Sequence, residues 1–285
     1  KHKPFSRLPN TNMFDDDTLD KLHEEEVGKG RPVLVCWYSG GFTAEDGIKT
    51  LFPVVDYLKK NGIEETLILH HSNEYGFTGE GYEPWPRYID RCVEEIDKTA
   101  AGRPLFLLGH SKGCCPALSM ATRLGTRVLK VYLLGTSSWL PKHPTPWEKL
   151  SKGFKKGGDK NLIGWLASLQ PSNVLLMRAA TLPDDEFNEA VEGSKLLKTM
   201  VTLMRLQYQN AMFPDMKNKV IDVFPADICA FPGLQDGGSR PPEMEGFRRY
   251  TKGRFNMHPI DAGHLDILTN AELHGKLCTD MLEYM

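Results

Sequence analysis

The sequence has no apolar run long enough to cross a membrane and no large excess of charge of either sign. Its longest apolar segments, such as residues 33–38, have the length of a strand, whereas a membrane helix needs about 18 residues or more. The first ten residues, KHKPFSRLPN, contain no apolar signal core, so we expect neither secretion nor a membrane partner. With 35 Lys and Arg against 37 Asp and Glu, we also expect no nucleic-acid partner.

Cysteine is scarce, and its spacing carries no sign of metal binding. None of the six cysteines falls in a CxxC pair or in a Cys/His spacing typical of zinc, so we expect no metal and no other cofactor. Several lie in apolar strand-like segments, which indicates buried free thiols in a reducing compartment, the cytoplasm. The cysteines are Cys36, Cys92, Cys114, Cys115, Cys229 and Cys278.

Length and composition are those of an ordinary globular protein. The 285 residues, 40% hydrophobic and 25% charged, can form either one domain with an inserted segment or two domains. This balance argues against a disordered, collagen-like or disulfide-stapled chain. The sequence does not begin with methionine, which leaves a stand-alone protein and a domain of a longer chain both open.

Apolar strand-like segments alternate with helical ones over much of the chain, which predicts an α/β fold with a mainly parallel sheet flanked by helices. The predicted strands are 32–38, 66–70, 104–108, 128–134, 226–231 and 254–258.

The alternation stops between residues 136 and 220, where only helical and loop patterns occur. We therefore predict an N-terminal lead-in (1–31), an α/β core (32–135 and 221–285) and an inserted helical lid (136–220). Within the lid, residues 152–160 (KGFKKGGDK) are expected to form a mobile, solvated basic loop.

Residues 109–113, GHSKG, form the pattern G-x-S-x-G between an apolar strand segment and a helical one. In this context the serine occupies a sharp turn from strand to helix, and the flanking glycines keep bulky side chains out of that turn. The helix N-terminus behind the hydroxyl favours developing negative charge. We therefore predict that Ser111 is a nucleophile, although a small-residue turn with a structural serine would give the same pattern.

A serine hydroxyl needs a base, and α/β-hydrolases carry serine, acid and histidine in that order along the chain. His264 lies in a Gly-rich loop after the last predicted strand, and Asp236 lies just after the strand 226–231. We predict His264 as the base and Asp236 as the carboxylate that orients it. The other candidates are His70, His71, His110, His274, Asp222, Asp227 and Asp261.

An oxyanion hole requires two backbone N–H donors close to the nucleophile. We expect one from Lys112, directly after Ser111, and the other from Ser39 in the turn at residues 38–42 (YSGGF). Gly40 in that turn lets a substrate approach the backbone closely. A simple strand-to-helix turn is the alternative interpretation.

Four segments together resemble the thioesterases of polyketide and nonribosomal-peptide synthesis, especially their stand-alone, type II members. They are residues 38–42, 103–113 (RPLFLLGHSKG), 233–236 (GLQD) and 263–264 (GH), and the resemblance spans residues 32–282. Two features depart from the family pattern. Lys112 stands where such enzymes usually have Met or Ala, and no carboxylate follows the fourth predicted strand, where synthase-fused domains commonly carry their Asp.

The resemblance implies an α/β-hydrolase that releases acyl or polyketide chains from the phosphopantetheine arm of an acyl carrier protein. It implies an acyl-enzyme on Ser111, no cofactor and a monomer. The Met- and Leu-rich segment 196–212 suits an apolar acyl chain, with Leu203 and Met204 as the expected contacts. Ordinary packing within the lid explains these residues equally well. A carboxylesterase or lipase is the alternative activity, and a non-catalytic binding protein with this fold is a further one.

Overall fold

A computed structural model describes residues 30–40, 42–70, 85–136, 146–169, 173–209 and 221–285, and in 146–157 and 204–209 it describes the backbone only. The predicted lead-in, residues 1–31, therefore lies almost entirely outside the described residues.

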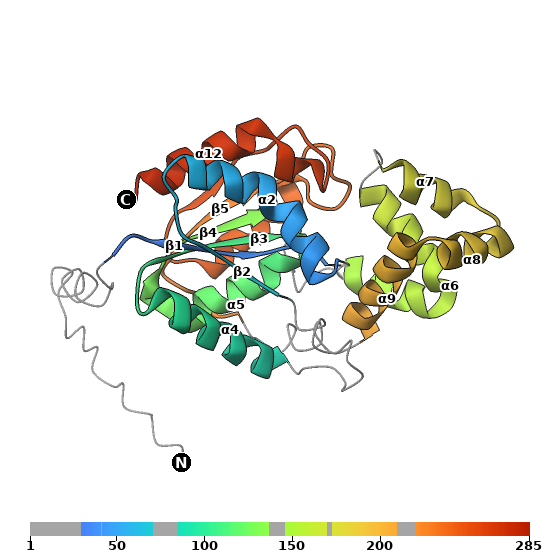
Figure 1. Cartoon of the computed structure of the whole chain (residues 1–285), viewed down its shortest axis with the longest axis horizontal. Coiled ribbons are helices and arrows are strands. Elements are labelled where there is room, and N and C mark those ends of the chain that lie inside the picture. Colours follow the sequence, from blue (N-terminus) through green and yellow to red (C-terminus); the bar gives the residue numbers. More distant parts are fainter. Residues whose placement is uncertain (1–29, 41, 71–84, 137–145, 170–172, 210–220) are drawn as a thin grey trace, which may run out of the picture.

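In the part of the chain that the structure describes, six parallel strands form one sheet in the order β2-β1-β3-β4-β5-β6 (Figure 1). Each strand falls on one of the predicted segments, and the α/β-hydrolase architecture expected from the sequence is confirmed. Because all strands run the same way, their carboxyl ends meet at one edge, where α/β folds collect their sites. The strands are β1 (Val33–Trp37), β2 (Thr66–Leu69), β3 (Leu105–His110), β4 (Val128–Leu134), β5 (Asp227–Phe231) and β6 (Phe255–Met257).

Helices cover both faces of the sheet, α2 (Ala44–Lys60) and α12 (Ala271–Leu282) on one face and α4 (Trp85–Ala100) and α5 (Cys114–Leu124) on the other. The sequence sets the ends of these helices locally. The Thr43 side chain caps α2 by accepting from the backbone N–H of Asp46, and Asn270 caps α12 in the same way. Short helical turns, η2 (Gly125–Arg127), α11 (Pro241–Met244), η3 (Glu245–Tyr250) and η4 (Asp266–Thr269), complete the core.

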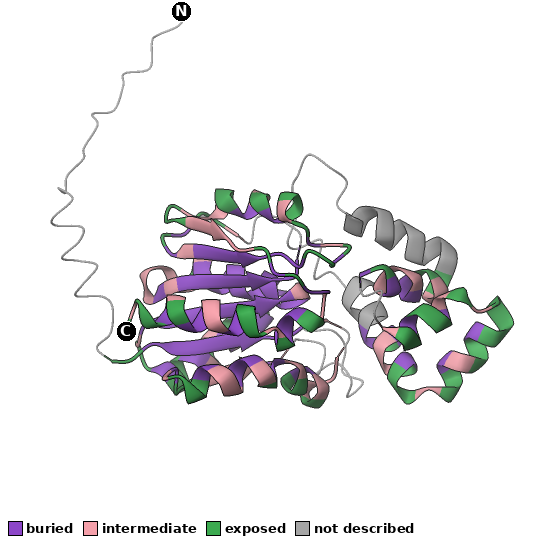
Figure 2. Ribbon diagram, turned by 90° about the horizontal axis from the view of Figure 1, so that it is seen from above, coloured by how far each residue is buried: buried purple, intermediate pink, exposed green. Residues whose placement is uncertain are grey.

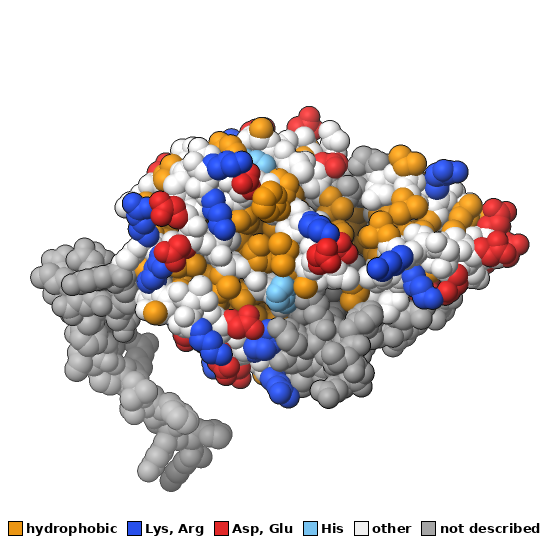
Figure 3. Space-filling model, in the orientation of Figure 1, with side chains coloured by type: hydrophobic (Ala, Val, Ile, Leu, Met, Phe, Trp, Pro, Cys, Tyr) orange, Lys and Arg blue, Asp and Glu red, His pale blue; other side chains and the backbone are white. Residues whose placement is uncertain are grey.

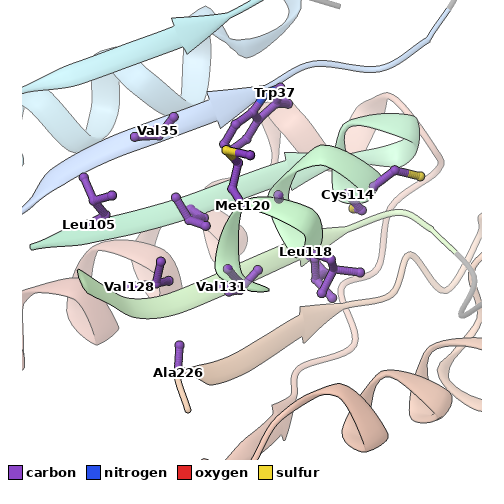
Figure 4. Packing of buried hydrophobic residues seen from close by; sticks show 14 of the residues in the cluster. Val35, Trp37, Leu105, Cys114, Leu118, Met120, Val128, Val131 and Ala226 are labelled. Carbon is purple, nitrogen blue, oxygen red and sulfur yellow. The ribbon is translucent and has the colours of Figure 1, made fainter. Parts of the chain in front are cut away.

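The core consists of two apolar layers, one on each side of the sheet; the central strands β1 and β3 are buried throughout, whereas the edge strands β2 and β6 are mostly half-buried (Figure 2). Alternate residues of β1 serve the two layers: Val33, Val35 and Trp37 face one, and Leu34 and Cys36 face the other. Figure 4 shows the first layer, in which Trp37 and Met120 pack together between β1 and α5. A strand buried on both faces must be apolar throughout, which explains the continuous apolar runs in the sequence. Truncating a large side chain there to alanine costs about 2–5 kcal/mol.

Among the residues described between β4 and β5, four helices stand beside the sheet rather than on its faces (Figure 1). They share an apolar cluster of their own that includes Ile163, Leu176, Phe187 and Leu197. Charges of both signs are interspersed over the face in Figure 3, and hydrophobic side chains gather at these helices. The helices are α6 (Pro146–Leu169), α7 (Val174–Thr181), α8 (Asp184–Gly193) and α9 (Lys195–Gln209).

The prediction of a loop at residues 152–160 was wrong, because this segment belongs to α6. The backbone departs from helical geometry at Gly158, where φ is 62°, and the helical turns resume after this kink. Glycine lowers helix stability by only about 1 kcal/mol relative to alanine. The buried turns that follow, at Leu162, Ile163 and Ala167, contribute more than this by packing.

Candidate active site

Ser111 stands on the turn between β3 and α5, at the carboxyl edge of the sheet. The strand ends at His110, residues Ser111–Gly113 form a turn of 3-10 helix (η1), and α5 begins at Cys114. Ser111 has a φ of 54°, in the left-handed region that non-glycine residues rarely adopt. This strained turn presents the hydroxyl to the cavity described below.

Gly109 and Gly113 are required by close packing on either side of that turn. A Cβ on Gly109 would lie 2.5 Å from the Cα of Cys114, where the helix folds back over the strand. A Cβ on Gly113 would lie 2.4 Å from the carbonyl oxygen of Trp37, at the end of β1. Both distances are far below van der Waals contact with backbone, so no side chain can be accommodated. The two glycines of the pattern thus allow α5 to lie directly against β1 and β3.

His264 approaches Ser111 from a loop that follows β6. Its Nε2 lies 2.9 Å from Ser111 Oγ, and its Nδ1 lies 2.6 Å from Asp236 Oδ2. A carboxylate only accepts hydrogen bonds, so the imidazole donates from Nδ1 and its Nε2 accepts from the serine hydroxyl. Three side chains that are distant in the sequence therefore form one hydrogen-bonded chain.

Asp236 is fully buried, with 0% of its surface exposed, and is held by several donors. Its Oδ1 accepts from the backbone N–H of Gly238 at 2.8 Å, and its Oδ2 accepts from Ser239 Oγ at 2.5 Å as well as from His264. Burial raises the pKa of Asp236, but the attraction of His264 and the hydrogen bonds from His264, Ser239 and Gly238 outweigh it and leave the pKa below its usual value. The carboxylate is therefore ionised at neutral pH.

Ser239 was not predicted from the sequence. Its hydroxyl is fully buried and donates a hydrogen bond to Asp236. The pattern Asp-Gly-Gly-Ser at 236–239 carried a signal for it, because Asp and Ser in such a turn bond to nearby backbone and to each other. The same turn packs closely against α6. A Cβ on Gly237 would lie 2.5 Å from the carbonyl oxygen of Ser168, near the end of α6.

Three of the competing candidates have other partners, and His71 lies outside the described residues. Asp227 accepts from Arg254 and Tyr284, and exposed Asp261 accepts from Gln235. His274 is buried in α12, where its Nε2 lies 2.9 Å from the carbonyl oxygen of Leu268.

A cavity opens above Ser111, between the edge of the sheet and helices α6, α7 and α9. Ser39, Gly40 and Lys112 line it, so the predicted oxyanion-hole residues and Gly40 lie next to Ser111. Burial lowers the pKa of the Lys112 side-chain amine well below its usual value. The remaining lining residues are mostly apolar, namely Phe42, Trp165, Leu166, Leu169, Asn173, Leu176, Met200 and Leu265.

The lid residues predicted to contact substrate are placed differently. Leu203 is buried, at 2% exposure, but it is not among the described residues that line the cavity. Met200, one turn earlier on α9, is among them. The side chain of Met204 lies outside the described residues. An apolar helix such as α9 offers many equivalent side chains, and only its packing decides which of them reaches the cavity.

The fold and this arrangement define an α/β-hydrolase architecture, and comparison with solved structures agrees. The chain is similar to RedJ, a thioesterase from the prodiginine biosynthetic pathway in Streptomyces coelicolor, with 14% identity, a TM-score of 0.58, and coverage of 90% of this chain and 91% of that one. It is similar to the type II thioesterase BorB from the borrelidin biosynthetic cluster, with 17% identity, a TM-score of 0.51 and coverage of 90% and 92%.

A haloalkane dehalogenase variant from Bradyrhizobium elkanii also matches, with 13% identity, a TM-score of 0.53 and coverage of 90% and 91%. No protein-family model and no curated protein matches the chain. At such identities the likeness establishes the fold, and one fold carries several reactions. Among the described residues, no helix is long and apolar enough to cross a membrane.

Proposed function

We propose that this protein is a serine hydrolase, specifically an acyl thioesterase, with Ser111 as nucleophile, His264 as general base and Asp236 as the orienting acid. One observation carries the proposal: the unbroken hydrogen-bonded chain from Ser111 Oγ through the His264 ring to a buried, ionised Asp236. A serine hydroxyl is a weak nucleophile. These hydrogen bonds give it a base, His264, and fix the tautomer of the His264 ring.

In the proposed reaction, Ser111 Oγ attacks the thioester carbonyl carbon while His264 Nε2 takes the hydroxyl proton. The tetrahedral intermediate collapses, the carbon–sulfur bond breaks, and His264 returns the proton to the departing thiolate. Water then attacks the acyl-serine ester, again losing a proton to His264. Collapse of the second intermediate releases the carboxylic acid and gives the proton back to Ser111. Asp236 stabilises the imidazolium at each stage and stays ionised.

The oxyanion of both intermediates is assigned to the backbone N–H groups of Ser39 and Lys112. Both residues line the cavity beside Ser111, and Ser111 precedes the N-terminus of α5. Donors that are already oriented toward the developing charge are typically worth 10²–10³ in rate each. The reaction needs no cofactor.

The proposed substrate is an acyl or polyketide chain on the phosphopantetheine arm of an acyl carrier protein. The support is the sequence resemblance, the likeness to RedJ and BorB, and a cavity lined mainly by apolar residues of the lid. Residues 136–220 would form the lid that encloses this chain, with Met200 and Trp165 as contacts in place of the predicted Leu203.

Two experiments test the proposal in sequence. A fluorophosphonate should form one adduct per chain on wild type, mapped to Ser111 by mass spectrometry and absent from Ser111→Ala. Labelling elsewhere, or none, would exclude the serine-hydrolase mechanism and favour a binding protein. A panel of thioesters and oxoesters with the same acyl groups then separates a thioesterase from a carboxylesterase or lipase, since the latter would favour the oxoesters.

A further inference from the structure

The proposed mechanism does not use His110, yet its ring lies beside the reacting groups. His110 is the last residue of β3, immediately before Ser111, and its side chain is fully buried. Its Nε2 lies 2.8 Å from the backbone carbonyl oxygen of His264, 154 residues further along the chain. The two imidazole rings stand 5.2 Å apart at 44°.

The protonation of His110 follows from its surroundings. A carbonyl oxygen only accepts hydrogen bonds, so the Nε2 of His110 carries the proton and donates it. Burial lowers the pKa of His110 to about 3, and repulsion from His264 adds to this effect. His110 therefore stays neutral at physiological pH and places no positive charge next to the imidazolium that would form on His264.

This hydrogen bond joins the two halves of the candidate site. Ser111 directly follows β3, whereas His264 lies in a loop. Backbone hydrogen bonds near His264 join residues of this loop to one another, as from Ile267 N–H to the carbonyl oxygen of Gly263, or to the turn of Asp236, as from Gln235 N–H to the carbonyl oxygen of Ala262. The donor on His110 attaches the backbone of His264 to the residue that precedes Ser111. Reaction rates depend steeply on such separations, and a displacement of about 1 Å can cost about 10² in rate.

We propose that His110 is a positioning residue whose Nε2–H donates to the carbonyl oxygen of His264 and so holds the base within hydrogen-bonding distance of Ser111. This inference rests on the proposed serine-hydrolase function. His110 touches no reacting atom and transfers no proton.

Four variants test the inference. His110→Met keeps the bulk and removes the donor, His110→Asn has an amide too short to reach the carbonyl oxygen, and His110→Gln has one long enough. His274→Met is the matched control, because His274 is also buried and its Nε2 lies 2.9 Å from a carbonyl oxygen, but that oxygen belongs to Leu268 and not to a proposed catalytic residue.

We expect kcat to fall about 10- to 100-fold in His110→Met and His110→Asn, with KM within about twofold of wild type. The rate of fluorophosphonate labelling should fall by the same factor, because it uses the same base. His110→Gln should recover most of both rates, and His274→Met should lower the melting temperature without changing either. If His110→Met does not fold, the test compares His110→Asn with His110→Gln.

Wild-type kcat in a folded His110→Met or His110→Asn, or equal impairment of Gln and Asn, would overturn the inference. Failure of the proposed function looks different, because wild type itself would then not be labelled at Ser111. In that case histidine ¹⁵N NMR of wild type still tests the contact. A protonated Nε2 on His110 that is protected from exchange supports it, and a ring protonated at Nδ1 refutes it.

Discussion

Replacing Asp236 with asparagine should lower kcat on an acyl thioester by about 10³- to 10⁴-fold, equivalent to about 4–5.5 kcal/mol of transition-state stabilisation. The structure shows how the loss arises. One carboxylate oxygen accepts from Gly238, and the other accepts from both Ser239 and His264. Asparagine has only one side-chain oxygen that can accept hydrogen bonds, so it cannot replace both carboxylate oxygens.

If the amide oxygen stays with Gly238, the amide N–H₂ faces His264 Nδ1 and forces the ring proton onto Nε2. That nitrogen then points a proton at Ser111 and cannot accept one. If the amide is flipped, its N–H₂ meets the N–H of Gly238 in a buried place, which costs about 1–3 kcal/mol. The first arrangement is thus favoured, and it is the inactive tautomer.

Asp261→Asn is the matched control, because it changes the same charge close to His264 in sequence. Asp261 is exposed and bonds to Gln235, so its loss should lower kcat at most about tenfold. Both variants should be assayed for kcat on one acyl thioester, after circular dichroism has shown that they are folded. A crippled Asp261→Asn beside a near-wild-type Asp236→Asn would refute the assignment of the acid.

Four further predictions concern neighbouring features. Ser239→Ala removes one donor to Asp236 but keeps the charge, so kcat should fall about tenfold; an unchanged kcat would show that the hydroxyl is dispensable. His110 has a pKa near 3 in the folded protein, below about 6.5 in the unfolded chain, so unfolding takes up a proton and stability should fall as pH drops below 6.5. At pH 5 this proton uptake should lower the free energy of unfolding by about 2 kcal/mol, and denaturant titration of His110→Gln should not show that loss. All six cysteines are buried and free, and burial raises their pKa, to about 12 for Cys92 and Cys229, so a thiol reagent should label the native protein slowly and the unfolded protein at six sites. Met200→Asp should weaken long acyl thioesters more than acetyl ones, whereas Met177→Asp, at a position 40% exposed on α7, should affect neither; equal losses across chain lengths would indicate damage to the lid instead.

Much of this protein could be read from the sequence because its signals are local. A strand buried on both faces must be apolar, so central strands such as β1 were visible as continuous apolar runs. The turn at residues 109–113 needs glycine on both sides of Ser111, and both glycines can be recognised in the sequence. The order of Ser111, Asp236 and His264 along the chain, each after a strand, is the reason for proposing them over their competitors, and their side chains are hydrogen-bonded to one another in the structure.

Only the tertiary structure decided which side chains meet. Residues 152–160 have the composition of a loop, but they belong to α6, which kinks at Gly158 and continues into a part buried at Leu162, Ile163 and Ala167. Met200 rather than Leu203 reaches the cavity, because the rotation of α9 depends on its neighbours and not on its own apolar pattern. His110 acquires its partner only when the loop of His264 reaches the end of β3 at the sheet edge. A hydrogen bond joins two specific atoms over less than 3.5 Å, and no local pattern in a sequence encodes a distance between segments that are 154 residues apart.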